Sequence, residues 1–370
     1  MLTDPLWMQR AEGSPDFGLA LRIGSGEILQ IWTLFDYHAI PYITVLTQLL
    51  PPSIGWPLTL LAPLAVGYAL GWGPWPTRAL LLWCGIHLFL IGGLKMQHVR
   101  YMVPVISFLA LCIGTSCDAL WQRTKSAPQH WSYGCVLALL IGHLRFYGTA
   151  FARIYIEEDS RIQAARFLAK QVPLGSHIGI ESGAFSMGPL LGPTHQAVTL
   201  GAGSLFYLAP YMLCATQVDF LWSYLRQMDY LTLNDINRAV QFRAVPTLFP
   251  VAAYFYEKLN DGHLGFTQIE RFREYPRLLG LAFNDEGSEP SFLGYDHPTV
   301  LVFRNEGEEE VERAVYHWRR AIAGNSHCAD TEMSEVVRSI EQGELERAAA
   351  GIEALIKRLP HAQLAYPLAA

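Results

Sequence analysis

The residues best suited to chemistry lie at the start of a long apolar run, in the stretch KMQHVRYMVPVISFLALCIG. Lys95, His98 and Arg100 fall within six residues, and a segment of bilayer-spanning length follows directly. The guanidinium fork of an arginine matches phosphate oxygens, and a lysine adds a point charge. Cations at a helix end also reach phospholipid headgroups by snorkelling. The spacing therefore leaves two interpretations: a phosphate site for a lipid-linked substrate, or ordinary anchoring at the membrane surface.

Composition divides the chain into a membrane part and an aqueous part. Between residues 54 and 151 Asp118 is the only acidic residue, whereas acids and bases return at ordinary density from Glu157 onward. The net charge of −6 is mild, and no basic run resembles a nucleic-acid-binding patch, so we exclude nucleic acid as a partner. The six cysteines form no CxxC pair, and no metal-ligand set is recognisable, so no cofactor is expected. Cys214 and Cys328 are too far apart in sequence to indicate a bridge, which leaves the redox compartment open.

Four segments are long and apolar enough to cross a bilayer, which requires about 20 residues. Tryptophans cluster at their ends, as expected for an interfacial aromatic belt. Core helices of a soluble protein rarely run this long without charge. The expected four-span region therefore covers residues 54–153, with spans at Ile54–Gly73, Arg78–Lys95, Tyr101–Trp121 and Trp131–Phe151.

Short loops predict the direction of the spans. Arg123 and Lys125 lie without an acid in the loop after the third span, which favours the cytoplasmic side. Residues 1–53, an outer-face loop segment, and the part after Phe151 then lie outside. This topology predicts an integral protein of the bacterial cytoplasmic membrane. The loop of Lys95 and Arg100 must also face outward, against the positive-inside tendency.

Secondary candidates lie near the same outer face. His98 and Tyr101 adjoin the two cations, with His98 either a hydrogen-bond donor or a bystander. His143 and Arg145 fall toward the outer end of the fourth span. Charged groups within spans usually face a cavity or a partner, although snorkelling accounts for these two nearly as well.

An aqueous α/β domain is expected at residues 155–305. Residues 159–172 have the pattern of an amphipathic helix, and Pro173 and Gly175 end it. Strand patterns occur at residues 176–183, 229–235, 266–276 and 298–305, and helical patterns lie between them. Residues 306–370 form an acidic, alanine-rich tail with the spacing of a helical hairpin. The fold class is thus an α-helical multi-span bundle followed by a small extracytoplasmic α/β domain and a helical tail.

Several stretches, in order, resemble membrane glycosyltransferases of the GT-C superfamily. The closest group is family 39, the protein O-mannosyltransferase-like enzymes that use polyprenyl-phosphate sugars. KMQHVRYMVPVISFLALCIG is similar to one span of that family, and QMDYLTLNDI to one of its strands. The other matching stretches are FDYHAIPYITVLTQLLPPSIGWPLTLLAPLAVGYAL, EDSRIQAARFLAKQVPLGSHIGIES and EYPRLLGLAFNDEGSEPSFLGYDHPTVLVFR. The resemblance covers about Leu6 to Arg304 and no single motif in it is decisive.

The resemblance implies transfer of a sugar, a mannose-like hexose, from a polyprenyl phosphate to an acceptor hydroxyl at the outer leaflet. A carboxylate serves as general base in that chemistry, and cations offset the charge on the leaving phosphate. Lys95 and Arg100 fit the second role. A divalent metal is sometimes linked to such enzymes.

The chain departs from the family at its acidic loop, which follows the first of many spans there. Asp4, Asp16, Glu27 and Asp36 precede the first span here but fall in what resembles a later loop, so the catalytic residue stays unknown. Asp36 is the least implausible of them. We therefore expect the carboxy-terminal half of a transferase, either truncated or paired with a separate amino-terminal half.

Two further interpretations remain. The Asp296-His297-Pro298 sequence suggests a catalytic dyad, but a turn that Asp296 stabilises is favoured. At the level of function, the alternative is a non-catalytic anchored protein whose α/β domain recruits a partner.

Overall fold

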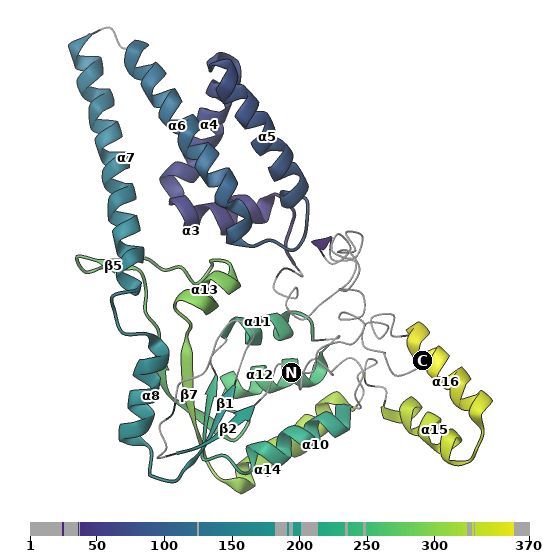
Figure 1. The fold of residues 1–370 in the computed structure, drawn as a ribbon. Helices are drawn as coiled ribbons and strands as arrows, with labels where there is room; N and C mark the ends of the chain where they lie inside the picture. Colours follow the sequence, from purple (N-terminus) through teal and green to yellow (C-terminus); the bar gives the residue numbers. More distant parts are fainter. Residues whose placement is uncertain are drawn as a thin grey trace.

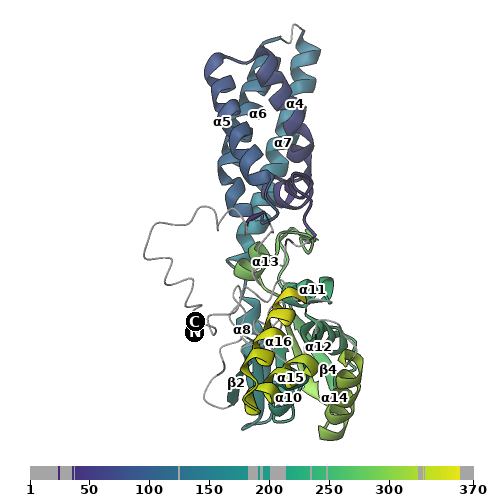
Figure 2. The same cartoon turned by 90° about the vertical axis from the view of Figure 1, so that its right-hand side faces the viewer.

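The computed structural model describes residues 24–25, 36, 38–123, 126–181, 191, 195–200, 214–233, 236–246, 249–323, 328 and 330–358. Figure 1 shows a bundle of long helices above an α/β unit, with a helical hairpin at the carboxyl end. Figure 2, turned by 90°, shows the bundle extending away from the α/β unit in one direction. Of the four acids before the first expected span, only Asp36 lies within the described residues.

The bundle consists of four helical passages. Three of them are long and apolar enough to cross a membrane, and the fourth qualifies only if two helices joined at a bend count as one span. In order, the passages are η2 (Val45–Leu49) with α3 (Leu50–Ile54) and α4 (Trp56–Trp72), α5 (Trp75–Gly92), η3 (Val99–Met102) with α6 (Val103–Arg123), and α7 (Ala127–Ile154).

The first passage is broken at Gly55. Its φ of 79° lies in the left-handed region, which glycine adopts readily, and the helical path bends by 112° between the helices on its two sides. α4 has 17 residues, fewer than a span of about 20 requires. The expected span at residues 54–73 is therefore a short helix preceded by a segment that crosses the end of the bundle.

The three loops between the passages and the connection that follows α7 can each be assigned to one end of the bundle. α7 ends at Ile154 and leads through a short turn into α8 (Ser160–Gln171), so this end carries the α/β unit (Figure 1). The connection from α5 to α6, which contains Lys95 and Arg100, lies at the same end. Arg78 and Arg123 lie at the opposite end. The cation-rich turn and the α/β unit thus share one side of the bundle.

A five-stranded mixed sheet forms the centre of the α/β unit, in the order β2-β1-β3-β7-β4. β1 pairs in parallel with β2 and β3, and β7 is antiparallel to both β3 and β4. Of these strands, the sequence pattern predicts β1, β3, β4 and β7, and gives no signal for β2. Their bounds are β1 (His177–Glu181), β2 (Gln196–Leu200), β3 (Tyr230–Leu233), β4 (Phe266–Phe272) and β7 (Val300–Asn305).

Helices cover both faces of this sheet. Leu168 of α8 packs on Ile178 and Val302 on one face. Strand residues that point the other way, among them Leu231 of β3 and Phe303 of β7, join a larger core on the other face. This alternation follows from the two-residue period of a strand. The helices of the second face are α10 (Cys214–Leu225), α11 (Ile236–Ala244), α12 (Pro250–Asn260) and α14 (Glu308–Ile322).

α14 belongs to this packed unit although the sequence places it in the tail. Val311, Val315 and Trp318 are buried in the larger core, and Trp318 has no exposed surface. The packed structure therefore continues past the expected boundary at residue 305. The hairpin of α15 (Asp330–Glu341) and α16 (Leu345–Arg358) follows, in agreement with the helical pattern of that region.

A disulfide joins Cys214 of α10 to Cys328, which precedes the hairpin. Their Cα atoms are 5.4 Å apart although 114 positions separate them in sequence. The sequence separation gave no basis for assigning this bridge, because it forms only when α14 folds back along α10 and brings the two cysteines together. The hairpin is covalently tied to the α/β unit.

The disulfide predicts a defined pattern of thiol labelling. Cys84, Cys112, Cys117 and Cys135 are free thiols. Under denaturing conditions we expect a maleimide to modify four cysteines before reduction and six after it, as measured by mass spectrometry of the intact chain. The Cys328→Ser variant should show five in both cases. Six modified cysteines in the unreduced wild-type protein would rule out the bridge.

Candidate functional site

The cation-rich turn between α5 and η3 is held by the segments that precede the bundle. The backbone N–H groups of Lys95 and Met96 both donate to the carbonyl of Gly24, at 2.9 and 3.1 Å. The N–H of Gln97 donates to Oδ2 of Asp36 at 3.1 Å. The Gln97 side chain is fully buried and donates to the carbonyls of Gly92 and Leu94. These contacts fix the path of the turn at both of its ends.

His98 connects the turn to the α/β unit. Its Nδ1 lies 3.1 Å from Oε1 of Glu289, and both side chains are 4% exposed. Oε2 of Glu289 accepts from the N–H of Phe292, in the first turn of α13 (Pro290–Asp296). A buried charge requires such partners, since desolvation otherwise outweighs its interactions. Asp36, His98 and Glu289 thus form a buried junction cluster drawn from three distant parts of the chain.

Asp36 has an altered acidity within the junction cluster. Desolvation by burial, together with a smaller contribution from the nearby charge of Glu289, raises the pKa of this carboxyl from 3.8 to about 7. The Gln97 N–H and the charge of His98 act in the opposite direction but do not offset burial. Asp36 therefore exchanges its proton near neutral pH.

The structure places Lys95, Arg100 and Tyr101 on one turn but gives them different surroundings. Arg100 is exposed on η3, and its guanidinium lies 5.4 Å from the ring centre of Tyr101. The Tyr101 ring also packs edge-on against His98, at 5.3 Å. Lys95 is half-buried. Arg100 is thus positioned by an aromatic ring and presents its fork to the surroundings.

Arg145 and His143 lie on different sides of α7. His143 and Tyr147 are four residues apart, stack on each other and line a common cavity. Arg145 is two residues from each, which on a helix of 3.6 residues per turn places it on the opposite side, where it is exposed. Of this pair, the cavity involves His143 rather than Arg145.

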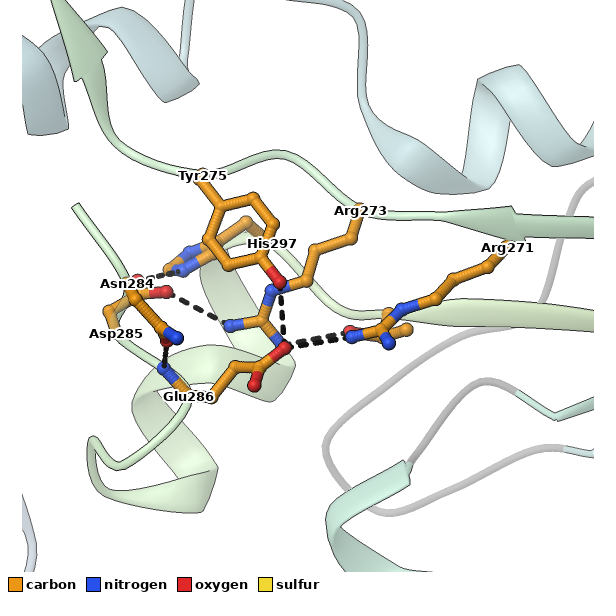
Figure 3. Close-up of polar contacts among 8 residues, drawn as sticks. Arg271, Arg273, Tyr275, Asn284, Asp285, Glu286 and His297 are labelled. Atoms are coloured by element: carbon orange, nitrogen blue, oxygen red, sulfur yellow. Dashed lines mark hydrogen bonds and ion pairs between the residues drawn. The ribbon is translucent and has the colours of Figure 1, made fainter. Parts of the chain in front are cut away.

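A second buried polar network joins residues 271–275 to residues 284–299 (Figure 3). Arg273 donates to Oδ1 of Asp285 at 2.9 Å and to the hydroxyl of Thr299 at 3.0 Å. Nε2 of His297 lies 2.6 Å from Oδ2 of the same carboxylate. The side chains of Arg273, Asp285 and His297 are all at most 5% exposed. Arg271 and Tyr275 both reach Glu286 beside this network, as Figure 3 shows.

This network rules out the catalytic dyad that the Asp296-His297 sequence suggested. Asp296 ends α13 and is hydrogen-bonded to Tyr155, whereas His297 pairs with Asp285. Asp296 and His297, although adjacent in sequence, therefore do not form a catalytic dyad. Sequence analysis did not identify Arg273 or Asp285, because 12 positions separate each of them from its partner. The network fixes the loop of residues 283–288 against the strands.

Among the described residues, no group of three histidine, cysteine or acidic side chains is arranged to hold a metal ion. The junction cluster contains two carboxylates and an imidazole, but they bind one another and the backbone around them.

Comparison with models of known families, with curated proteins and with solved structures finds no match to this chain. The resemblance to polyprenyl-phosphate-sugar transferases accordingly stays a prediction.

The raised pKa of Asp36 predicts a pH-dependent stability. Between pH 4 and 7 the folded state keeps a proton that the unfolded chain has lost, so raising the pH lowers the free energy of unfolding. The effect is limited to a few kcal/mol, at about 1.4 kcal/mol per pKa unit. We expect Asp36→Asn to reduce the loss of melting temperature between pH 5 and pH 8 in detergent. The exposed Asp261→Asn variant should retain it, and equal slopes in all three proteins would contradict the prediction.

The buried ion pair predicts a large cost for removing its cation. Arg273→Met leaves Asp285 buried beside His297 alone, which should destabilise the α/β unit by roughly 3–5 kcal/mol in urea unfolding followed by tryptophan fluorescence. The matched variant Arg271→Met breaks an exposed pair with Glu286, at 43% and 44% exposure, and should cost about 1 kcal/mol or less. Equal losses would show that the network does not anchor the loop.

Proposed function

We propose that this chain is the carboxy-terminal part of an integral-membrane glycosyltransferase. It would move a mannose-like hexose from a polyprenyl-phosphate donor to an acceptor hydroxyl at the outer face of the membrane. The proposal rests on one observation. The turn with Lys95 and Arg100 lies at the end of the bundle that bears the α/β unit, and the contacts of the junction cluster hold it there.

The chemistry of the donor explains why this position matters. A polyprenyl phosphate keeps its chain in the bilayer and its phosphate at the surface, where the ends of the spans lie. Negative charge builds on that phosphate as the sugar departs, and fixed cations stabilise it. Arg100 offers an exposed guanidinium that stacks on Tyr101, so less of its freedom is lost on binding.

The disulfide supports an extracytoplasmic location for the α/β unit. Bridges persist in oxidising compartments and are rare in the cytosol. The cations at the other end of the bundle, Arg78 and Arg123, agree with a cytoplasmic location for that end. Both arguments favour the outer leaflet for the turn of Lys95 and Arg100.

The proposal includes a partner. The general base of the reaction would come from the acidic loop of a separate amino-terminal half. Asp36 titrates near neutral pH but is 7% exposed and held in the junction cluster, so its role in the proposal is to position the turn.

The test measures binding of undecaprenyl phosphate to the full chain in nanodiscs by native mass spectrometry. Neutralising both cations in Lys95→Gln/Arg100→Gln should weaken binding at least about tenfold, since each charge-assisted hydrogen bond contributes roughly 1.5–3 kcal/mol. The matched control is Arg78→Gln/Arg123→Gln, which removes two cations from the opposite end and should bind as the wild type does.

Two outcomes would contradict the proposal. One is equal binding in both double variants, which would leave the anchored scaffold as the better interpretation. The other is a cytoplasmic location for the turn, measured by labelling a single cysteine placed at Arg100 with a membrane-impermeant maleimide in intact cells. An outward turn predicts labelling without permeabilisation.

A further inference from the structure

A cavity of about 250 Å³ lies between the bundle and the α/β unit, separate from the junction cluster. Three segments distant in sequence enclose it: the bend before α4, the outer part of α7, and the loop of residues 283–288. Drug-sized ligands occupy cavities of roughly 300–1,000 Å³, so this one suits a single small ring.

His143 is one of the polar residues that line this cavity. Its Nε2 atom is buried and has no hydrogen-bond partner among the described residues, a situation that costs free energy unless a group from outside the chain binds it. The ring lies against Gly55, where a Cβ atom would be 2.8 Å from Nε2. The bend at Gly55, with its positive φ, therefore leaves the space that this ring occupies.

Aromatic rings supply the apolar walls. Tyr147 stacks on His143 with ring centres 6.0 Å apart, and Phe283 meets Tyr147 edge-on at 5.1 Å. The Tyr147 hydroxyl donates to the carbonyl of Pro52 at 3.0 Å, which fixes the ring. Trp56 lines the rim and is 56% exposed. A ligand with a flat apolar face fits such walls.

The charge of the cavity favours a neutral ligand. Asp285 lines it, but Arg273 and His297 bind both oxygens of this carboxylate. The remaining polar lining groups include the amide of Asn284 and the hydroxyl of Ser288, which can donate to and accept from hydroxyl groups. Aromatic faces with neutral hydrogen-bonding groups between them match a ring that has C–H faces and hydroxyl edges.

We infer that this cavity binds one neutral pyranose ring, with His143 hydrogen-bonded to a sugar hydroxyl and Tyr147 and Phe283 against the C–H face. The choice of a pyranose among small neutral polyols rests on the proposed function. The ring could belong to the lipid-linked donor or to an acceptor glycan, and both present the same chemistry to the cavity.

The test uses methyl α-D-mannopyranoside and the full chain in nanodiscs, with saturation-transfer NMR as the readout. We expect transfer to the ring protons of the sugar, reduced about threefold to tenfold in apparent affinity by His143→Ala, which removes one hydrogen bond. His130→Ala is the matched control, since His130 is a partly buried histidine near the opposite end of the same helix and does not line the cavity. Undiminished transfer in His143→Ala, or none in the wild type, would overturn the inference.

Two further experiments test whether the sugar binds in this cavity and whether it belongs to the donor or to the acceptor. Asn284→Trp places a bulky ring at the cavity and should abolish transfer, while an unchanged melting temperature and undecaprenyl phosphate binding show that it folds. Competition by mannosyl phosphoryl undecaprenol but not by undecaprenyl phosphate would identify the donor sugar as the ligand, and competition by neither would identify the acceptor. Sugar binding that depends on His143 stands even if Lys95 and Arg100 prove irrelevant to phosphate, so the two proposals fail separately.

Discussion

Buried polar groups must have partners, and this requirement determines how the helical bundle meets the α/β unit. Asp36, His98 and Glu289 are each at most 7% exposed, and each comes from a different part of the chain. The imidazole of His98 bonds to Glu289, and Asp36 accepts from the backbone next to it. Separating the two parts would remove the partner that His98 and Glu289 provide for each other, which is unfavourable for buried polar groups. The turn between α5 and η3 is therefore part of an interface rather than a loose connection.

The network of Arg273, Asp285 and His297 likewise holds a segment of the α/β unit in place. Arg273 and His297 hold Asp285, and Asp285 lies in the loop that closes the cavity against α7. A loop of this kind contains few apolar residues to bury, so its position depends on ion pairs and hydrogen bonds. The two networks give one end of the bundle a fixed surface, with exposed Arg100 on one part and the cavity of His143 on another. The proposed functions of the turn and of the cavity both depend on that rigidity.

Much of the fold could be predicted because its signals are local. The long apolar helices follow from composition, and β1, β3, β4 and β7 follow from alternation and flanking turn residues. The break at Gly55 was missed because an apolar segment has the same hydropathy whether it is straight or bent. The packing of α14 was missed because its acidic first turn suggested a solvated tail, whereas Trp318 lies on its other face.

Composition and periodicity are enough to indicate which segments are apolar enough to cross a membrane, where most strands of the α/β unit lie, and that cations gather at one turn. Which distant residues meet depends on packing in three dimensions: Cys214 with Cys328, His98 with Glu289, and His297 with Asp285 rather than with its neighbour Asp296. The physical reason is that periodicity and composition report how each residue is solvated along its own helix or strand. A disulfide, an ion pair or a cavity depends on distances through space, which arise only when those elements pack together.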